Sequence, residues 1–212
     1  MPAHRPDLIV FAGPNGSGKT TLTNIGRQHH WAATCLYINP DDIARDQFGD
    51  WNSPDAVLKA ARTAEAIRED CLRTGRPFMF ETVFSTVDKV QFLMKAKRAG
   101  FFIRFFFVGT EHPDINVRRV ATRVAKGGHD VPEDRIRARY YRAINNAIAG
   151  LAIADRGYLY DNSVEDTPAR LIFRTNDGHI EKVYADDIPE WTGQVMEALY
   201  AHDVAPGDDH GR

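Results

Sequence analysis

The stretch Gly13-Pro14-Asn15-Gly16-Ser17-Gly18-Lys19-Thr20 decides the fold of this chain, because it fits the pattern Gly-x-x-x-x-Gly-Lys-Ser/Thr. It follows an apolar run at residues 8–12 and precedes a helix-like segment at residues 19–28. Glycines in such a loop let backbone N–H groups turn inward around a phosphate, and the start of the following helix adds positive potential. The pattern therefore predicts a phosphate-binding loop between a buried strand and a helix.

The residues of this loop have different expected roles toward a bound nucleotide. Lys19 is expected to reach the β- and γ-phosphates, and the Thr20 hydroxyl is expected to ligate Mg²⁺. The other positions are predicted to surround the phosphates: Gly13, Pro14, Asn15, Gly16, Ser17 and Gly18. The alternative is a glycine-rich turn that binds no ligand.

The segments around the loop alternate between strand-like and helix-like patterns. Short apolar runs typical of buried parallel strands lie at residues 8–12, 36–39, 78–82, 101–108 and 158–160. Helix-like stretches lie at residues 19–28, 41–48, 53–74, 86–99, 116–126 and 132–154. This alternation predicts a three-layer α/β fold with a parallel central sheet. Asn176-Asp177-Gly178 indicates an antiparallel hairpin between residues 171–174 and 180–184, followed by a closing helix at 188–200.

Composition limits the classes to which the chain can belong. It has 212 residues, 43% hydrophobic and 26% charged, which is typical of a globular protein. Lys and Arg number 27 against 29 Asp and Glu, a net charge of −2, so no global basic field favours bulk nucleic acid or an anionic membrane. The sequence has only two cysteines, and it shows no signal-peptide pattern and no apolar run long enough to span a membrane. These features favour a cytoplasmic protein. We expect one domain at residues 1–204 and a flexible tail at 205–212.

Acidic residues end two of the predicted strands. Asp41 and Asp42 follow the strand at 36–39, and Glu81 lies at the end of the strand at 78–82. Ligands of doubly wound sheets collect at the carboxyl ends of the strands, so Asp41 is the candidate base that would orient and deprotonate an acceptor hydroxyl. The alternative for Asp41 and Asp42 is helix capping. Three roles are open for Glu81: it could bind acceptor hydroxyls, order a metal-bound water or be purely structural.

A basic helix pair is the second informative region. Arg119, Arg123 and Lys126 are spaced i, i+4, i+7 and therefore share one helical face. Gly127-Gly128 ends this helix, and the next one carries further arginines: Arg135, Arg137, Arg139 and Arg142. The pattern predicts a lid at about residues 116–142, with Arg123 spreading phosphate charge. The alternative is an ordinary solvated helix pair, which is favoured for Arg135, Arg137 and Arg142. His129 fits a phosphate donor and a surface residue equally well.

Several segments together resemble the zeta toxin family of P-loop kinases and its chromosomal relatives. They are the loop at 13–20, Asn39-Pro40-Asp41-Asp42, Glu81-Thr82-Val83-Phe84-Ser85, residues 119–132, Arg139-Tyr140 and Asp161-Asn162-Ser163. The resemblance implies a three-layer P-loop NTPase fold of the nucleoside-kinase-like type, with a C-terminal hairpin and a helical lid.

The same resemblance implies an activity and its participants. It implies ATP- and Mg²⁺-dependent phosphorylation of a small-molecule hydroxyl, with UDP-N-acetylglucosamine as the family's best-known acceptor and an antitoxin as a partner. It places the base at Asp41, and Lys19 and Arg123 on the transferring phosphate. Glu81 and Thr82 are candidate acceptor-binding residues, and Arg119 and Asn162 are candidate nucleotide contacts, although Asn162 fits a turn cap equally well.

Two other functions remain open at this point. One is a nucleotide-gated module that binds a protein partner without phosphoryl transfer. The other is a kinase of nucleic-acid ends, which the near-neutral charge disfavours and the arginine-rich helices keep open.

Overall fold

The computed structural model describes residues 5–48, 53–128 and 130–204, with side chains up to residue 201. The tail expected at 205–212 and His129 lie outside the described residues.

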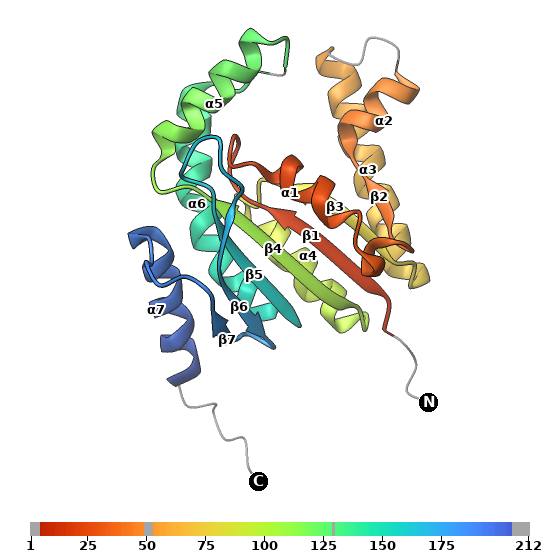
Figure 1. Ribbon diagram of the computed structural model, residues 1–212. Helices are drawn as coiled ribbons and strands as arrows, with labels where there is room; N and C mark the ends of the chain where they lie inside the picture. Colours follow the sequence, from red (N-terminus) through yellow and green to blue (C-terminus); the bar gives the residue numbers. More distant parts are fainter. Residues whose placement is uncertain (1–4, 49–52, 129, 205–212) are drawn as a thin grey trace.

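A seven-stranded sheet forms the centre of the fold, in the order β2-β3-β1-β4-β5-β6-β7 (Figure 1). The first five strands in this order pair in parallel, and the β5–β6 and β6–β7 pairs are antiparallel. The strands are β1 (Asp7–Ala12), β2 (Leu36–Ile38), β3 (Phe78–Thr82), β4 (Phe102–Gly109), β5 (Arg156–Asp161), β6 (Arg170–Asn176) and β7 (His179–Val183). The expected parallel sheet and the antiparallel hairpin at its edge are both confirmed.

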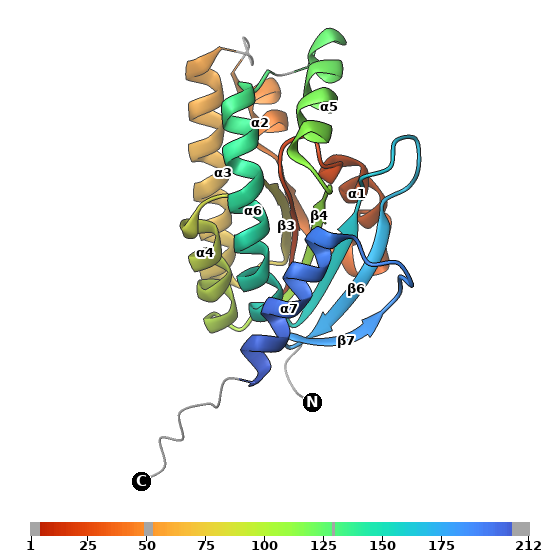
Figure 2. The same cartoon turned by 90° about the vertical axis from the view of Figure 1, so that its left-hand side faces the viewer.

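Helices cover the sheet on both faces, as a three-layer fold requires. They are α1 (Lys19–Gly26), η1 (His30–Ala32), α2 (Pro40–Gln47), α3 (Pro54–Thr74), α4 (Val87–Arg98), α5 (Pro113–Ala125), α6 (Glu133–Ile153) and α7 (Glu190–Val204). Figure 2 shows α3, α4 and α6 side by side on one face and α1 on the other. The core is rich in phenylalanine, and Phe78 packs edge-on against both Phe92 and Phe101.

The starts of α2 and α3 are each fixed by a side-chain cap. Ser53 accepts a hydrogen bond from the N–H of Ala56 at 3.2 Å, which starts α3 at Pro54 as its sequence indicates. At α2 the capping alternative was wrong for Asp41 and Asp42, because Asn39 is the cap and its Oδ1 accepts from the N–H of Asp41 at 3.0 Å. Both aspartates lie in the first turn of α2, where the helix dipole favours a carboxylate.

The strand order places the phosphate loop at the centre of the sheet. β1 lies between β3 and β4, with Ala12 in register with Thr82 on one side and with Phe107 on the other. The loop that follows β1 therefore meets the carboxyl ends of both neighbours. This is the point where the order of strands changes direction, and ligands of such sheets bind there.

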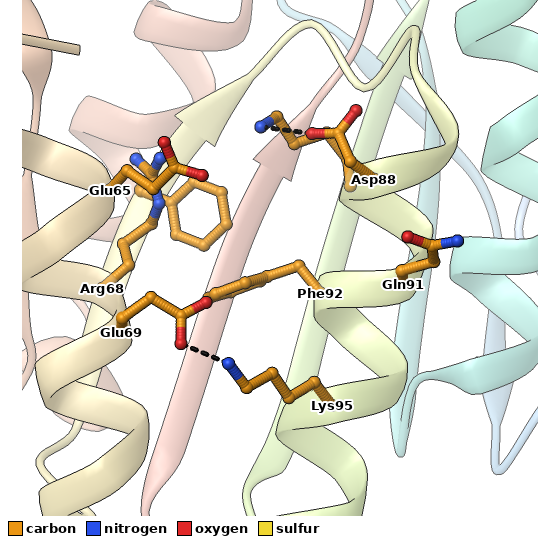
Figure 3. Close-up of a pocket in the computed structure, with 9 residues that line it drawn as sticks. Glu65, Arg68, Glu69, Asp88, Gln91, Phe92 and Lys95 are labelled. Atoms are coloured by element: carbon orange, nitrogen blue, oxygen red, sulfur yellow. Dashed lines mark hydrogen bonds and ion pairs between the residues drawn. The ribbon is translucent and has the colours of Figure 1, made fainter. Parts of the chain in front are cut away.

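Alternation along β3 directs successive side chains to opposite faces. Met79 packs in the cluster on the α1 face, and Phe80 packs in the cluster under α3 and α4. Phe80 lines a cavity of about 240 Å³ between α3 and α4, where the guanidinium of Arg68 lies over its ring (Figure 3). Glu81 comes next and accepts from Thr20 of α1, so its carboxylate and this cavity lie on opposite faces of the sheet.

Within the part of the chain that the structure describes, no helix combines the length and the hydropathy needed to span a bilayer.

Candidate nucleotide-binding site

The loop predicted to bind phosphate joins β1 directly to α1. Gly16 and Gly18 have φ values of 75° and 97°, and α1 begins at Lys19. The ammonium of Lys19 donates to the carbonyl of Pro14 at 2.8 Å, so its side chain folds back across the loop. The glycine conformations and the helix start give the loop the geometry that a phosphate cradle requires.

Two neighbouring segments closely approach the loop at its glycines of positive φ. A Cβ on Gly16 would lie 2.7 Å from the carbonyl oxygen of Asn116 in α5, and a Cβ on Gly18 would lie 2.4 Å from Nδ2 of Asn162. These glycines therefore allow α5 and the segment after β5 to contact the loop, in addition to supplying the left-handed backbone.

Asn116 fixes the loop from α5, a role that the sequence did not predict. Its side chain is fully buried, and its amide donates to the carbonyl of Asn15 at 2.6 Å. Its Oδ1 accepts from the hydroxyl of Thr110, which is also fully buried. An asparagine in an amphipathic helix gives no sequence signal for this contact, because the partners lie far away in the chain.

Asn162 and Arg119 come together as a second support. Nδ2 of Asn162 donates to the carbonyl of Ser17 at 2.8 Å, and Arg119 Nη1 donates to the carbonyl of Asn162 at 2.8 Å. Asn162 thus binds the loop backbone itself, which neither sequence interpretation of this residue included. Arg139 of α6 also reaches the loop, with Nη1 3.5 Å from Oδ1 of Asn15. It belongs to the arginine-rich helix, but the sequence did not distinguish it as a loop contact.

Charges around Lys19 define the electrostatics of the loop. Burial lowers the pKa of Lys19 to about 8, the carboxylate of Glu81 opposes that shift, and the guanidinium of Arg123 adds to it. Arg123 is exposed near the end of α5, and Gly128 packs against its side-chain stem. The structure therefore brings Arg123 close enough to affect Lys19.

Glu81 links the loop to two strands. Its Oε2 accepts from the hydroxyl of Thr20 at 3.0 Å, and its Oε1 accepts from the hydroxyl of Tyr37 at 3.0 Å. Thr20 comes from α1, Tyr37 from β2 and Glu81 from β3. A threonine hydroxyl beside a carboxylate is a set of hard oxygen donors, which suits Mg²⁺.

The other candidate acceptor residues, Asp41 and Thr82, lie just after β2 and at the end of β3. Asp41 is exposed in the first turn of α2, just after β2, while its neighbour Asp42 forms an ion pair with Arg45 at 2.7 Å. The hydroxyl of Thr82 accepts from the N–H of Phe84 at 3.1 Å.

Phe84 follows β3 with an unusual backbone. It is buried with a φ of 57°, a left-handed conformation that is strained for a bulky residue, and Asn146 of α6 donates to its carbonyl at 3.0 Å. Strained residues of this kind cluster at functional sites, and the sequence gives no sign of this one.

Together these features define the class: a P-loop nucleotide-binding protein with a kinase-like fold. A family described as an AAA domain matches residues 8–143, and the chain belongs to this family. An uncharacterized protein of Haemophilus influenzae is 31% identical over 132 residues, which cover 62% of this chain and 91% of that protein.

Two solved structures share the fold at low sequence identity. A chain from the PezAT chromosomal toxin-antitoxin system of Streptococcus pneumoniae matches with a TM-score of 0.60 and 15% identity, covering 94% of this chain and 85% of that one. A chain of the AvrRxo1-ORF1:-ORF2 complex with ATP matches with a TM-score of 0.55 and 15% identity, covering 94% of this chain and 77% of that one. The resemblance to zeta-toxin-like P-loop kinases is thereby confirmed at the level of the fold.

Proposed function

We propose that this protein is an ATP-dependent kinase that transfers the γ-phosphate to a hydroxyl of a small molecule, with a sugar nucleotide such as UDP-N-acetylglucosamine as the acceptor. The observation that carries the proposal is the grouping of Lys19, Thr20 and Glu81 beside Arg123 at the end of β1. Phosphoryl transfer depends on positioning and charge stabilisation, and this grouping supplies groups for both.

Mg²⁺ fits the oxygen donors present at the loop. Thr20 would hold the ion directly, and the carboxylate of Glu81, 3.0 Å from the Thr20 hydroxyl, would orient its water ligands. When bound, the ion neutralises charge between the β- and γ-phosphates.

The loop and the lid have different roles in binding ATP. Backbone N–H groups of the loop between Asn15 and Thr20 and the ammonium of Lys19 bind the β- and γ-phosphates. Asn162 and Arg119 hold the loop and the segment beside it. Arg123 then approaches the transferring group from a lid at about residues 116–142, within one kinase domain at residues 1–204.

Asp41 is the proposed base. It accepts the proton of the acceptor hydroxyl as that oxygen bonds to the γ-phosphorus, and the bond from phosphorus to the bridging oxygen of ADP breaks. Its exposure after β2 leaves the carboxylate open to a substrate. Glu81 and Thr82 lie on the neighbouring strand, and we propose that they contribute to acceptor binding.

The test is transfer of labelled phosphate from ATP to UDP-N-acetylglucosamine and to a panel of sugars and nucleotides. Asp41→Asn should lower the transfer rate by about 10²–10⁴-fold, the usual contribution of a general base, with ATP affinity within about twofold of wild type. Asp42→Asn is the matched control, because Asp42 is engaged by Arg45. Transfer by Asp41→Asn within a few fold of wild type would exclude Asp41 as the base.

A second candidate function is a nucleotide-gated module that binds a protein partner, such as an antitoxin. The fold similarity to a chain from a toxin-antitoxin system favours it. It predicts tight ATP binding with no transfer to any acceptor, so nucleotide binding measured beside the transfer assay separates the two functions. In the kinase proposal, an antitoxin would be a partner that blocks the same site.

A further inference from the structure

We infer that Tyr37 is a positioning residue for the metal, because it fixes the carboxylate of Glu81 toward the hydroxyl of Thr20. The inference rests on the proposed Mg²⁺-dependent use of ATP. It assigns a role to a β2 residue that is outside the phosphate loop and outside the motifs of the sequence.

The hydrogen bonds occupy both oxygens of the carboxylate. Tyr37 donates to Oε1 and Thr20 donates to Oε2, each at 3.0 Å. A glutamate held at only one oxygen can rotate about its terminal torsion, which is broad and has little preference of its own. With Tyr37 on Oε1, the plane of the carboxylate is set and Oε2 stays on the side of Thr20.

The sheet explains why Tyr37 reaches this position. Tyr37 is in register with Met79 on β3, and Glu81 lies two residues farther along the same strand. Residues two apart on a strand share a face, so Met79 and Glu81 point to the same side as Tyr37. A tyrosine has the length to cross this diagonal of the sheet with its hydroxyl.

The ring of Tyr37 is itself held in place. The guanidinium of Arg27 lies 4.4 Å from the ring centroid, in a cation–π arrangement. Arg27 caps the end of α1, and Thr20 lies at the start of the same helix. One helix therefore contributes both the proposed metal ligand and the cation that packs on the positioning residue.

The test measures how strongly Mg²⁺ assists nucleotide binding, independently of turnover. A fluorescent ATP analogue is titrated in excess EDTA and in excess Mg²⁺. The dissociation constant in EDTA is divided by the dissociation constant in Mg²⁺, and this ratio is compared among variants. Residues that orient metal ligands typically change metal affinity by about 10–100-fold. We expect Tyr37→Phe to reduce the ratio by about tenfold while affinity in EDTA stays within about twofold.

Two further variants complete the design. Glu81→Gln should reduce the ratio at least as much as Tyr37→Phe. The ratio of the double variant should be no lower than that of Glu81→Gln alone, because both substitutions act through the Glu81 carboxylate. Tyr158→Phe is the matched control, since Tyr158 of β5 stacks on Phe106 of β4, and β5 is separated from β3 by β1 and β4. Thermal unfolding shows whether each variant is folded.

The outcomes separate this inference from the proposed function. If Glu81→Gln lowers the ratio and folded Tyr37→Phe does not, Tyr37 does not position the metal and the kinase proposal stands. If Tyr37→Phe loses affinity equally in EDTA and in Mg²⁺, its role is structural and the inference is also overturned. Failure of the wild type to bind the analogue in either condition would overturn both the function and the inference.

Discussion

Replacement of Asn116 by alanine tests whether α5 holds the phosphate loop in its binding conformation. The change removes the amide that donates to the carbonyl of Asn15 at 2.6 Å and the oxygen that accepts from Thr110. Both polar groups are then left without these partners in a buried region, at a cost of about 1–3 kcal/mol each. The cost for Thr110 is at the low end of this range, because its hydroxyl is also 3.4 Å from the carbonyl of His112 and keeps that hydrogen bond.

These contributions sum to a loss of about 3 kcal/mol in the free energy of unfolding. For a chain of this size, the corresponding fall in Tm is about 6–12 °C. Nucleotide affinity should also fall, because ordering the backbone of one released loop residue costs about 1–2 kcal/mol. If this loop residue is ordered only when ATP binds, the dissociation constant for ATP rises about tenfold.

Urea unfolding and calorimetric titration with ATP measure the two effects separately. Asn24→Ala is the matched control, since Asn24 is exposed on α1, and it should change neither quantity measurably. A loss of stability with unchanged ATP affinity would show that Asn116 supports the core and not the loop. Unchanged stability would refute the energetic reasoning altogether.

Three further changes test other parts of the structure. Because burial lowers the pKa of Lys19 to about 8, the loop loses its ammonium above that pH. The calorimetric dissociation constant for ATP should therefore rise between about pH 7 and about pH 9 in wild type and stay flat in Lys19→Met. The same rise in both proteins would contradict this assignment. Gly18→Ala would place alanine at a φ of 97° with its Cβ 2.4 Å from Nδ2 of Asn162, so it should weaken ATP binding by about tenfold or more. Adding Asn162→Ala removes the contact and leaves the strained φ, so it should restore only part of the binding. Normal ATP binding by Gly18→Ala would contradict this reasoning. Asp155 accepts from Arg5 at 2.6 Å, Lys97 at 2.9 Å and the N–H of Ile103 at 2.8 Å, and these partners, acting against burial, hold the pKa of this carboxyl below its ordinary value of 3.8. The stability that its ionised form supplies is present above pH 3.8 and is lost as pH falls through the lowered pKa. In urea unfolding, Asp155→Asn should therefore be about 2 kcal/mol less stable at neutral pH, and its free energy of unfolding should fall less steeply than that of wild type as pH is lowered. Parallel plots of the free energy of unfolding against pH for the two proteins would contradict this role of Asp155.

Local patterns in the sequence were sufficient to predict the sheet, the loop and the hairpin. Residues 13–20 are one continuous segment, which makes the turn after β1 and the first two residues of α1, so all of the signal lies in eight neighbouring positions. The apolar runs predicted five parallel strands because a strand covered on both faces needs apolar side chains at every position. The turn at Asp177-Gly178 has positive φ at both residues, as the sequence of the hairpin indicates.

What the tertiary structure decided is how distant polar groups meet around that loop. Asn116 binds Asn15 from 101 residues away, Asn162 binds Ser17 from 145 residues away, and Tyr37 reaches Glu81 across 44 residues. None of these pairs has a spacing that a helix or strand period would reveal. Their contacts depend on strand order and on the packing of α5 over the loop, because a hydrogen bond needs its two atoms within about 3 Å and only the folded chain sets that distance.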